Sequence, residues 1–176
     1  MAHGALEESG EAFEKAVRLA PNQAEVRNHY GLYLLRVNRV PEAIEQFEAA
    51  RTDYTYRNPS MILNNLGQAL MMDGQTDEAI ARLSEAISRS PNLCQPRINR
   101  GRAWQEANNA EQALKDYEAA IRLCEASDVS LYYTGSLLIE MGRSSEGCGH
   151  LDQARALNPD SDMADRANDL FIRECD

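Results

Sequence analysis

One spacing governs almost the whole chain of 176 residues. Four glycines follow each other at intervals of 36, 34 and 34 residues: Gly31, Gly67, Gly101 and Gly135. An aromatic or leucine series and an alanine series keep the same rhythm: Phe13, Phe47, Leu83, Tyr117 and Leu151, then Ala16, Ala50, Ala86, Ala120 and Ala154. Three series on one spacing predict stacked repeats, in which each unit buries its apolar face against its neighbours.

Each repeat has the pattern of two helices. The glycines lie in the motifs YGLYL, LGQAL, RGRAW and TGSLL, and the second half of each repeat contains EAIEQF, EAIARL, QALKDY or GCGHL. Small residues on both helices allow a close approach. Pro21, Pro91 and Pro159 end three of the blocks, because proline cannot continue a helix. This pattern resembles the tetratricopeptide repeat, a helix–turn–helix unit of 34 residues.

The expected fold is all-α: a single domain that forms a right-handed superhelical solenoid of antiparallel helix pairs. We expect a second helix of an incomplete first repeat at 4–20, then full repeats at 24–52, 60–89, 94–124 and 128–157, and a capping helix at 162–175. The first of these helices leaves a face around Leu6, Phe13 and Val17 uncovered. We therefore expect the natural protein to extend N-terminally by at least one helix.

Four cysteines allow three pairings, and the repeat spacing favours one of them. Cys94 opens a first helix and Cys124 ends the second helix of the same repeat, so antiparallel packing brings the two together. Cys148 begins the last second helix, and Cys175 ends the capping helix beside it. We expect the disulfides Cys94–Cys124 and Cys148–Cys175, which indicate an oxidising compartment. The alternative is four free, half-buried thiols in a cytosolic protein.

Charge and motifs argue against several classes of function. The net charge is −10, whereas a nucleic-acid-binding protein normally carries a basic face. We find no catalytic motif and expect neither an enzyme nor a cofactor. Cys148 and His150 are too close for the usual spacing of zinc ligands, so no metal site is expected. No apolar run is long enough for a membrane span, and the first residues do not have the pattern of a signal peptide.

The expected binding surface is the concave wall formed by the first helices, at the second, fifth, ninth and twelfth residues of each. The candidates are Leu32, Leu35, Met61, Asn64, Gln68, Met71, Ile98, Arg102, Val129, Tyr132 and Ile139. Met and Tyr suit adaptable contacts, so Met61, Met71 and Tyr132 indicate a groove for a partner segment such as an amphipathic helix. Leu32 and Ile98 are equally compatible with filling gaps between helices.

A clamp for a carboxyl terminus is the weaker alternative. Co-chaperones with tetratricopeptide repeats hold the end of a chaperone with Lys, Asn and Arg on successive first helices. The wall here offers Asn28, Asn64, Asn65 and Asn99. It has no lysine, so a fixed cation for the carboxylate would have to come from Arg102 or its neighbours.

A narrower resemblance lies in residues 28–79, NHYGLYLLRVNRVPEAIEQFEAARTDYTYRNPSMILNNLGQALMMDGQTDEA. This stretch resembles the type IV pilus biogenesis lipoproteins PilF, PilW and Tgl, which have a lengthened connection with a Tyr and a Pro before an NLG helix. The matching residues are Tyr30, Gly31, Tyr54 or Tyr56, Pro59, Asn65, Leu66 and Gly67. We expect Tyr54, Tyr56 and Pro59 to pack across the joint between the two repeats.

The resemblance implies a pilotin, a monomer on the periplasmic face of the outer membrane that helps the secretin, the pilus exit pore, to localise and assemble. The cysteines of this chain are similar to those of Tgl-like members. Members of this family are anchored by a lipidated N-terminal Cys that this chain lacks, which a truncated mature form explains. The protein partner is then the secretin, with no nucleic acid. The alternative is a cytoplasmic adaptor or co-chaperone with a different client.

Overall fold

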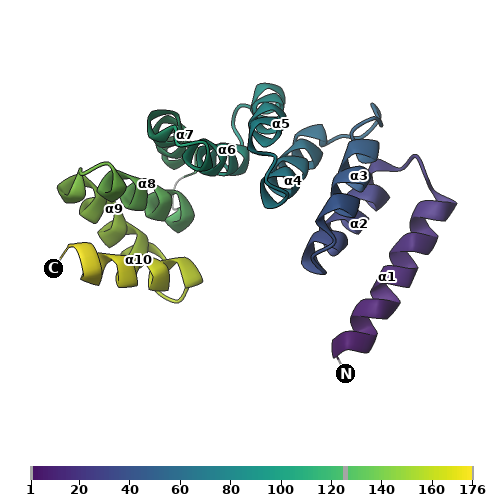
Figure 1. Ribbon diagram of the computed structural model, residues 1–176, viewed down its shortest axis with the longest axis horizontal. Coiled ribbons are helices and arrows are strands. Elements are labelled where there is room, and N and C mark those ends of the chain that lie inside the picture. The colour runs from purple at the N-terminus through teal and green to yellow at the C-terminus, as the bar shows by residue number, and fades with distance from the viewer. Residues whose placement is uncertain (1, 125–126, 176) are drawn as a thin grey trace. The chain divides into compact units, whose positions relative to one another are not determined.

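The computed structural model describes residues 2–124 and 127–175, with side chains from residue 8 onwards, so Leu6 lies outside the described side chains. The elements in these ranges are all α-helices (Figure 1): α1 (Ala2–Leu19), α2 (Ala24–Arg36), α3 (Val40–Ala50), α4 (Pro59–Met72), α5 (Thr76–Arg89), α6 (Gln95–Glu106), α7 (Ala110–Leu123), α8 (Asp128–Glu140), α9 (Ser144–Leu157) and α10 (Asp162–Glu174). The all-α prediction is confirmed, and each repeat boundary agrees with its prediction to within two residues.

The helices of each pair are joined by the same turn. The middle residue of each turn has a positive φ: Asn38 (60°), Gly74 (77°), Asn108 (57°) and Gly142 (78°). The next residue donates its N–H back to the helix, as Arg39 does to the Leu34 carbonyl and Gln75 to the Leu70 carbonyl, both at 2.8 Å. This is the Schellman end of a helix, which favours Gly or Asn at the left-handed position.

A contact between a glycine and a large side chain defines the interior of each helix pair. Phe47, Leu83, Tyr117 and Leu151 are completely buried. Each lies directly against the glycine of its first helix, so that a Cβ atom built on Gly31 would stand 2.6 Å from the Phe47 ring. The two repeat series of the sequence therefore meet in space, and this contact fixes how closely the helices pack.

The chain divides into two compact units, Met1–Pro91 (unit 1) and Asn92–Asp176 (unit 2). Each is described here by itself, and the single-domain organisation stays a prediction. In unit 1, α1 packs on α2 through Phe13, whose ring centroid lies 5.4 Å from that of Tyr33 and 6.0 Å from that of Tyr30. Phe13 and Val17 are half-buried, so the face of α1 is less open than predicted.

The lengthened connection between α3 and α4 is held by Asp53. One carboxylate oxygen of Asp53 accepts the backbone N–H and the hydroxyl of Thr55, at 2.9 and 2.6 Å. The other accepts the N–H of Ala24 at the start of α2, at 3.2 Å. The bonds from Thr55 and Ala24 lower the pKa of Asp53. Tyr56 and Pro59 are half-buried here, but Tyr54 is 95% exposed, so the prediction that Tyr54 packs across the joint is wrong.

Unit 2 is closed by two disulfides, Cys94–Cys124 and Cys148–Cys175, with Cα–Cα distances of 6.0 and 5.8 Å. These are the pairs predicted from the repeat spacing. A buried ion pair lies beside the first disulfide's helices: Asp116 of α7 accepts two hydrogen bonds of 2.7 Å from Arg100 of α6. The two helices of this repeat, α6 and α7, are thus held together by an ion pair as well as by a disulfide at their ends.

Alanine substitutions at two glycines of α9 are expected to have opposite effects on the free energy of unfolding. A Cβ atom on Gly147 would lie 2.7 Å from the carbonyl oxygen of Gly135 in α8, whereas a Cβ atom on Gly149 meets nothing within 4 Å. We expect Gly147→Ala to reduce the free energy of unfolding by about 1–3 kcal/mol through overpacking. Gly149→Ala should raise it by about 0.5–1 kcal/mol, since alanine is the better helix residue. Urea denaturation of both variants measures this, and destabilisation by Gly149→Ala would contradict it.

Candidate functional site

The accessible side of the first helices differs from the predicted wall. The second, sixth, ninth and thirteenth residues form the exposed stripe of α2: Glu25, His29, Leu32 and Arg36. In α4 the exposed residues of the same register are Met61, Gln68 and Met72. The predicted fifth and twelfth residues instead turn toward neighbouring helices. Asn64 and Ile98 are buried, and neither can line an open surface as predicted.

The buried asparagines of unit 1 form a polar link between repeats. The side-chain amide of Asn65 in α4 donates to Asn28 in α2 at 2.9 Å, and Asn64 donates to Asn65 at 3.4 Å. These bonds satisfy polar groups that would be costly to bury alone. Asn28 and Asn65, two of the four asparagines that resembled part of a carboxylate clamp, therefore hold α2 and α4 together.

The exposed stripe of unit 1 carries three large apolar side chains. Leu32 is 40% exposed, Met61 46% and Met72 51%, while the predicted Leu35 and Met71 are half-buried. Gln68 is exposed as predicted. Met72 was missed because it lies one residue beyond the predicted wall position Met71, at the end of α4, although its spacing of eleven residues from Met61 keeps it on the same side of a 3.6-residue helix.

The corresponding residues of unit 2 form an aromatic and cationic surface. Of the predicted residues, Arg102, Val129, Tyr132 and Ile139 are half-buried. Tyr133, which sequence reasoning passed over, stacks on the buried Tyr117 with ring centroids 5.6 Å apart. The Arg102 guanidinium lies 5.6 Å from the centre of the Tyr133 ring. This surface is thus more polar than the one on unit 1.

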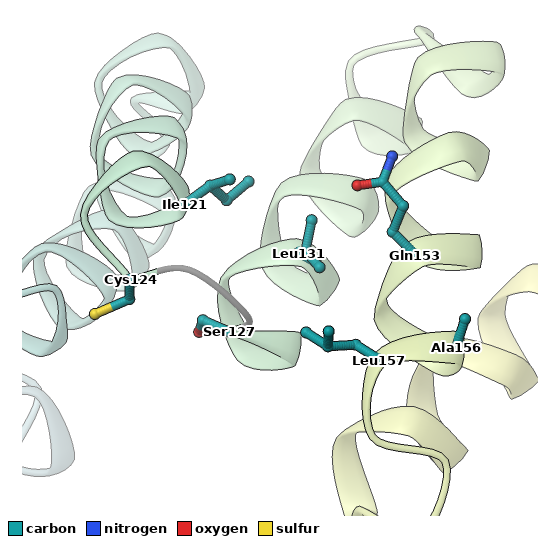
Figure 2. Close-up of a pocket in the computed structure, with 7 residues that line it drawn as sticks. All are labelled: Ile121, Cys124, Ser127, Leu131, Gln153, Ala156 and Leu157. Atoms are coloured by element: carbon teal, nitrogen blue, oxygen red, sulfur yellow. The ribbon is translucent and has the colours of Figure 1, made fainter.

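A separate apolar cavity lies at the carboxyl ends of the second helices in unit 2. It has a volume of about 530 Å³ and is lined by Ile121, Cys124, Ser127, Leu131, Gln153, Ala156 and Leu157. Figure 2 shows Ile121 of α7, Leu131 of α8 and Leu157 of α9 around the same hollow. Leu157 is 41% exposed at its edge. The cavity holds one polar side-chain amide and one hydroxyl, with no group suited to catalysis among its lining residues.

His150 lies in α9, and its side chain is half-buried. Burial lowers the pKa of His150, and this outweighs the opposite influence of Glu118 and Glu146. Its Nδ1 atom is buried and has no hydrogen-bond partner among the described residues. No group of three or more His, Cys, Asp or Glu side chains is placed to hold a metal ion in that same part.

The pKa of His150 predicts a loss of stability in acid. Because the folded-state pKa lies below the ordinary value near 6.5, unfolding binds a proton as the pH falls below about 6.5. The free energy of unfolding should decrease over that range, and His150→Gln should reduce the decrease. Thermal melts of the wild type and of His150→Gln between neutral pH and the folded-state pKa measure this. A variant at the exposed His29 serves as control, and identical pH profiles for wild type and His150→Gln would contradict the prediction.

Comparison with sequence families identifies the repeats. Residues 31–93 and residues 129–161 both match the tetratricopeptide repeat. Probable UDP-N-acetylglucosamine–peptide N-acetylglucosaminyltransferase SPINDLY from Hordeum vulgare is 28% identical over 115 residues, 62% of this chain and 12% of that protein. Protein FlbA from Caulobacter vibrioides is 31% identical over 136 residues, 74% of this chain and 22% of that protein. The chain therefore spans less than a quarter of either relative.

Solved structures with the same fold cover most of the chain. The structure of PilW, a widely conserved type IV pilus biogenesis factor, has a TM-score of 0.81 at 23% identity and covers 92% of this chain and 74% of that one. MamA gives 0.77 at 18% identity, with 90% and 91% covered. YrrB, a TPR protein with an unusual peptide-binding site, gives 0.70 at 20% identity, with 96% and 86% covered. At these identities the likeness concerns the fold.

None of the helices in the described ranges is both long and apolar enough to cross a membrane.

The pair α6–α7 lies outside both family matches. It nevertheless has the same contact between glycine and large side chain, at Gly101 and Tyr117, and the same turn at Asn108. The chain is accordingly a tetratricopeptide-repeat protein, and the described pairs α2–α3, α4–α5, α6–α7 and α8–α9 share the repeat's glycine contact.

Proposed function

We propose that the chain is a non-enzymatic protein-interaction scaffold of the pilotin type, which helps the outer-membrane secretin of the type IV pilus to localise and assemble. The lengthened connection 51–58 carries the proposal, because it contains the Tyr and Pro of the resemblance to the pilus lipoproteins. The connections 20–23, 90–94 and 158–161 are shorter. The fold likeness to PilW supports the same assignment.

The exposed apolar side chains of unit 1 are the proposed contact for the secretin. The surface is made of uncharged, apolar side chains: Leu32 on α2 and Met61 and Met72 on α4. The two methionines can adapt their shape to a partner. Adjacent helices of this unit are fixed by the asparagine link, so the surface is preorganised before a partner arrives. A secretin segment with an apolar face suits this surface.

We place the protein on the periplasmic face of the outer membrane, as a monomer attached by a lipid on a segment N-terminal to this chain. The two disulfides support an oxidising compartment. The anchor itself is tested by the upstream coding sequence, where a signal peptide that ends in a lipidated Cys is expected.

The test is binding of the purified secretin to the chain and to charged variants. Leu32→Glu combined with Met61→Glu should weaken binding by about tenfold or more, since a central apolar contact is lost. Leu19→Glu is the matched control in the same unit, because Leu19 is 77% exposed on α1. Secretin assembly in a strain that lacks the protein is the second measurement. Normal assembly there would remove the pilotin function, and unchanged binding by the double variant would remove the proposed surface.

A further inference from the structure

Three helices of unit 2 bring two arginines onto one pair of tyrosines. The guanidinium of Arg102 on α6 lies 5.6 Å from the Tyr133 ring, and that of Arg166 on α10 lies 4.7 Å from the Tyr132 ring. The two rings of α8 meet edge to face, with centroids 5.3 Å apart. Arg166 also donates to the Tyr132 hydroxyl at 3.3 Å. We name these four residues the arginine–tyrosine cluster.

The arginines of the cluster have no carboxylate partner among the described residues. This distinguishes them from five other arginines of unit 2, which form ion pairs: Arg97, Arg100, Arg143, Arg155 and Arg173. A guanidinium that lies over a ring uses its face, and its in-plane N–H donors stay available at the edge. A carboxylate is the ligand that fits such donors best, because it can accept two parallel hydrogen bonds.

The cluster is held in place by contacts behind it. Tyr133 stacks on Tyr117, which is fully buried and donates from its hydroxyl to Gln105 at 3.1 Å. The helix that carries Arg166 is tied to α9 by Cys148–Cys175. At its start, Ser161 donates to Asp128 of α8 at 2.6 Å. Arg102 and Arg166 are therefore positioned in advance, which reduces the entropy lost on binding.

Neighbouring acidic groups limit the kind of anion that fits. Glu106 lines a cleft of about 290 Å³ together with Arg102, Gln105 and Tyr133. Glu140 accepts a hydrogen bond of 2.8 Å from Gln105 beside it. A polyanion such as a nucleic acid would be repelled by these carboxylates and by the net charge of −10. A single carboxylate among uncharged residues avoids most of this repulsion.

We propose that the arginine–tyrosine cluster binds a protein segment through one Asp or Glu carboxylate, which accepts hydrogen bonds from the N–H edges of the arginines. The inference rests on the proposed scaffold function and deepens it, because it assigns a chemical feature to the partner. It concerns unit 2 alone and is independent of the apolar residues of unit 1. The two rings hold the guanidinium groups in place, and the carboxylate is the group that the cluster selects.

The test uses two labelled peptides with the whole chain. One carries a single Glu among Ser, Leu and Gly residues, and the other has Gln in its place. Fluorescence anisotropy should give a dissociation constant about tenfold lower for the Glu peptide, as expected for a charge-assisted hydrogen bond. Arg102→Gln and Arg166→Gln should each remove that difference and leave the affinity for the Gln peptide unchanged. The matched control is Arg122→Gln, since Arg122 is exposed on α7 and forms no ion pair within the described ranges.

Equal affinity for the two peptides would overturn the inference, as would a loss of affinity in Arg122→Gln equal to that in Arg166→Gln. The same variants, tested with the secretin, separate this inference from the proposed function. Secretin binding that survives Arg102→Gln and Arg166→Gln leaves the pilotin proposal standing and assigns the cluster to another partner. Preference for the Glu peptide in a protein that does not bind the secretin supports the cluster and contradicts the pilotin proposal.

Discussion

Reduction of each disulfide should lower the free energy of unfolding of unit 2 by about 3–4 kcal/mol, since each bridge restricts the unfolded chain. The linked residues are 30 and 27 positions apart, so the two bridges should have similar effects. All four cysteines of the chain lie beyond residue 91, within unit 2. The effect should therefore be concentrated in α6–α10.

Hydrogen exchange with and without dithiothreitol measures this distribution. Amides of α6–α10 should lose protection on reduction, and amides of α2–α5 should retain it. The paired variants Cys94→Ser with Cys124→Ser, and Cys148→Ser with Cys175→Ser, isolate each bridge. Four alkylatable thiols in native protein prepared without reductant would contradict both bridges and the proposed compartment.

Asp116→Ala is expected to destabilise unit 2 by about 3–5 kcal/mol, because it removes a buried carboxylate that two arginines contact. Asp116 is 5% exposed, and besides the two bonds from Arg100 its carboxylate lies 3.8 Å from Arg97. The matched control is Asp152→Ala. Asp152 pairs with Arg155 at 2.8 Å, but its side chain is 61% exposed, so the expected cost is below about 1 kcal/mol.

Urea denaturation of the two alanine variants measures both effects on one scale. Asp116→Asn keeps the shape of the side chain and removes only its charge, so its stability should fall between those of the wild type and Asp116→Ala. Equal destabilisation by Asp116→Ala and Asp152→Ala would show that burial of the Arg100 pair contributes nothing.

The repeat spacing was enough to predict the fold because two of its residue series touch each other in the structure. Gly31 and Phe47 belong to different series of the sequence and touch in the structure. A chain that repeats such a contact at constant spacing has little choice of helix boundaries. The same argument predicted the cysteine pairs, since they lie at helix ends that antiparallel packing brings together.

The binding wall was predicted less well because its rotation about the helix axis was misjudged. At about 100° per residue, the fifth and twelfth positions lie within about 60° of the glycine in the eighth. They are therefore less accessible, and Asn64 is buried and Met71 half-buried. The thirteenth position lies farther round, which places Arg36 and Met72 in the open, whereas the sixth position is open in α2 at His29 and buried in α4 at Asn65. The glycine itself was the signal that would have corrected the prediction.

The contacts of α10 could not be predicted from spacing of apolar residues. Arg166 stands one repeat length, 34 residues, after Tyr132, and this places the two in equivalent positions of adjacent first helices. Whether an arginine there stacks on a ring or pairs with an acid depends on the side chains around it. Tyr54 is a similar case, because only the hydrogen bonds of Asp53 determine where the connection points.

The turns at Asn38, Gly74, Asn108 and Gly142 limit where the chain can change its length. Each stands seven residues after the packing glycine of its first helix. An insertion or deletion between these two points would move either the left-handed residue or the glycine out of place. Length variation is therefore confined to the segments between successive pairs, and residues 51–58 are where this chain has used that freedom.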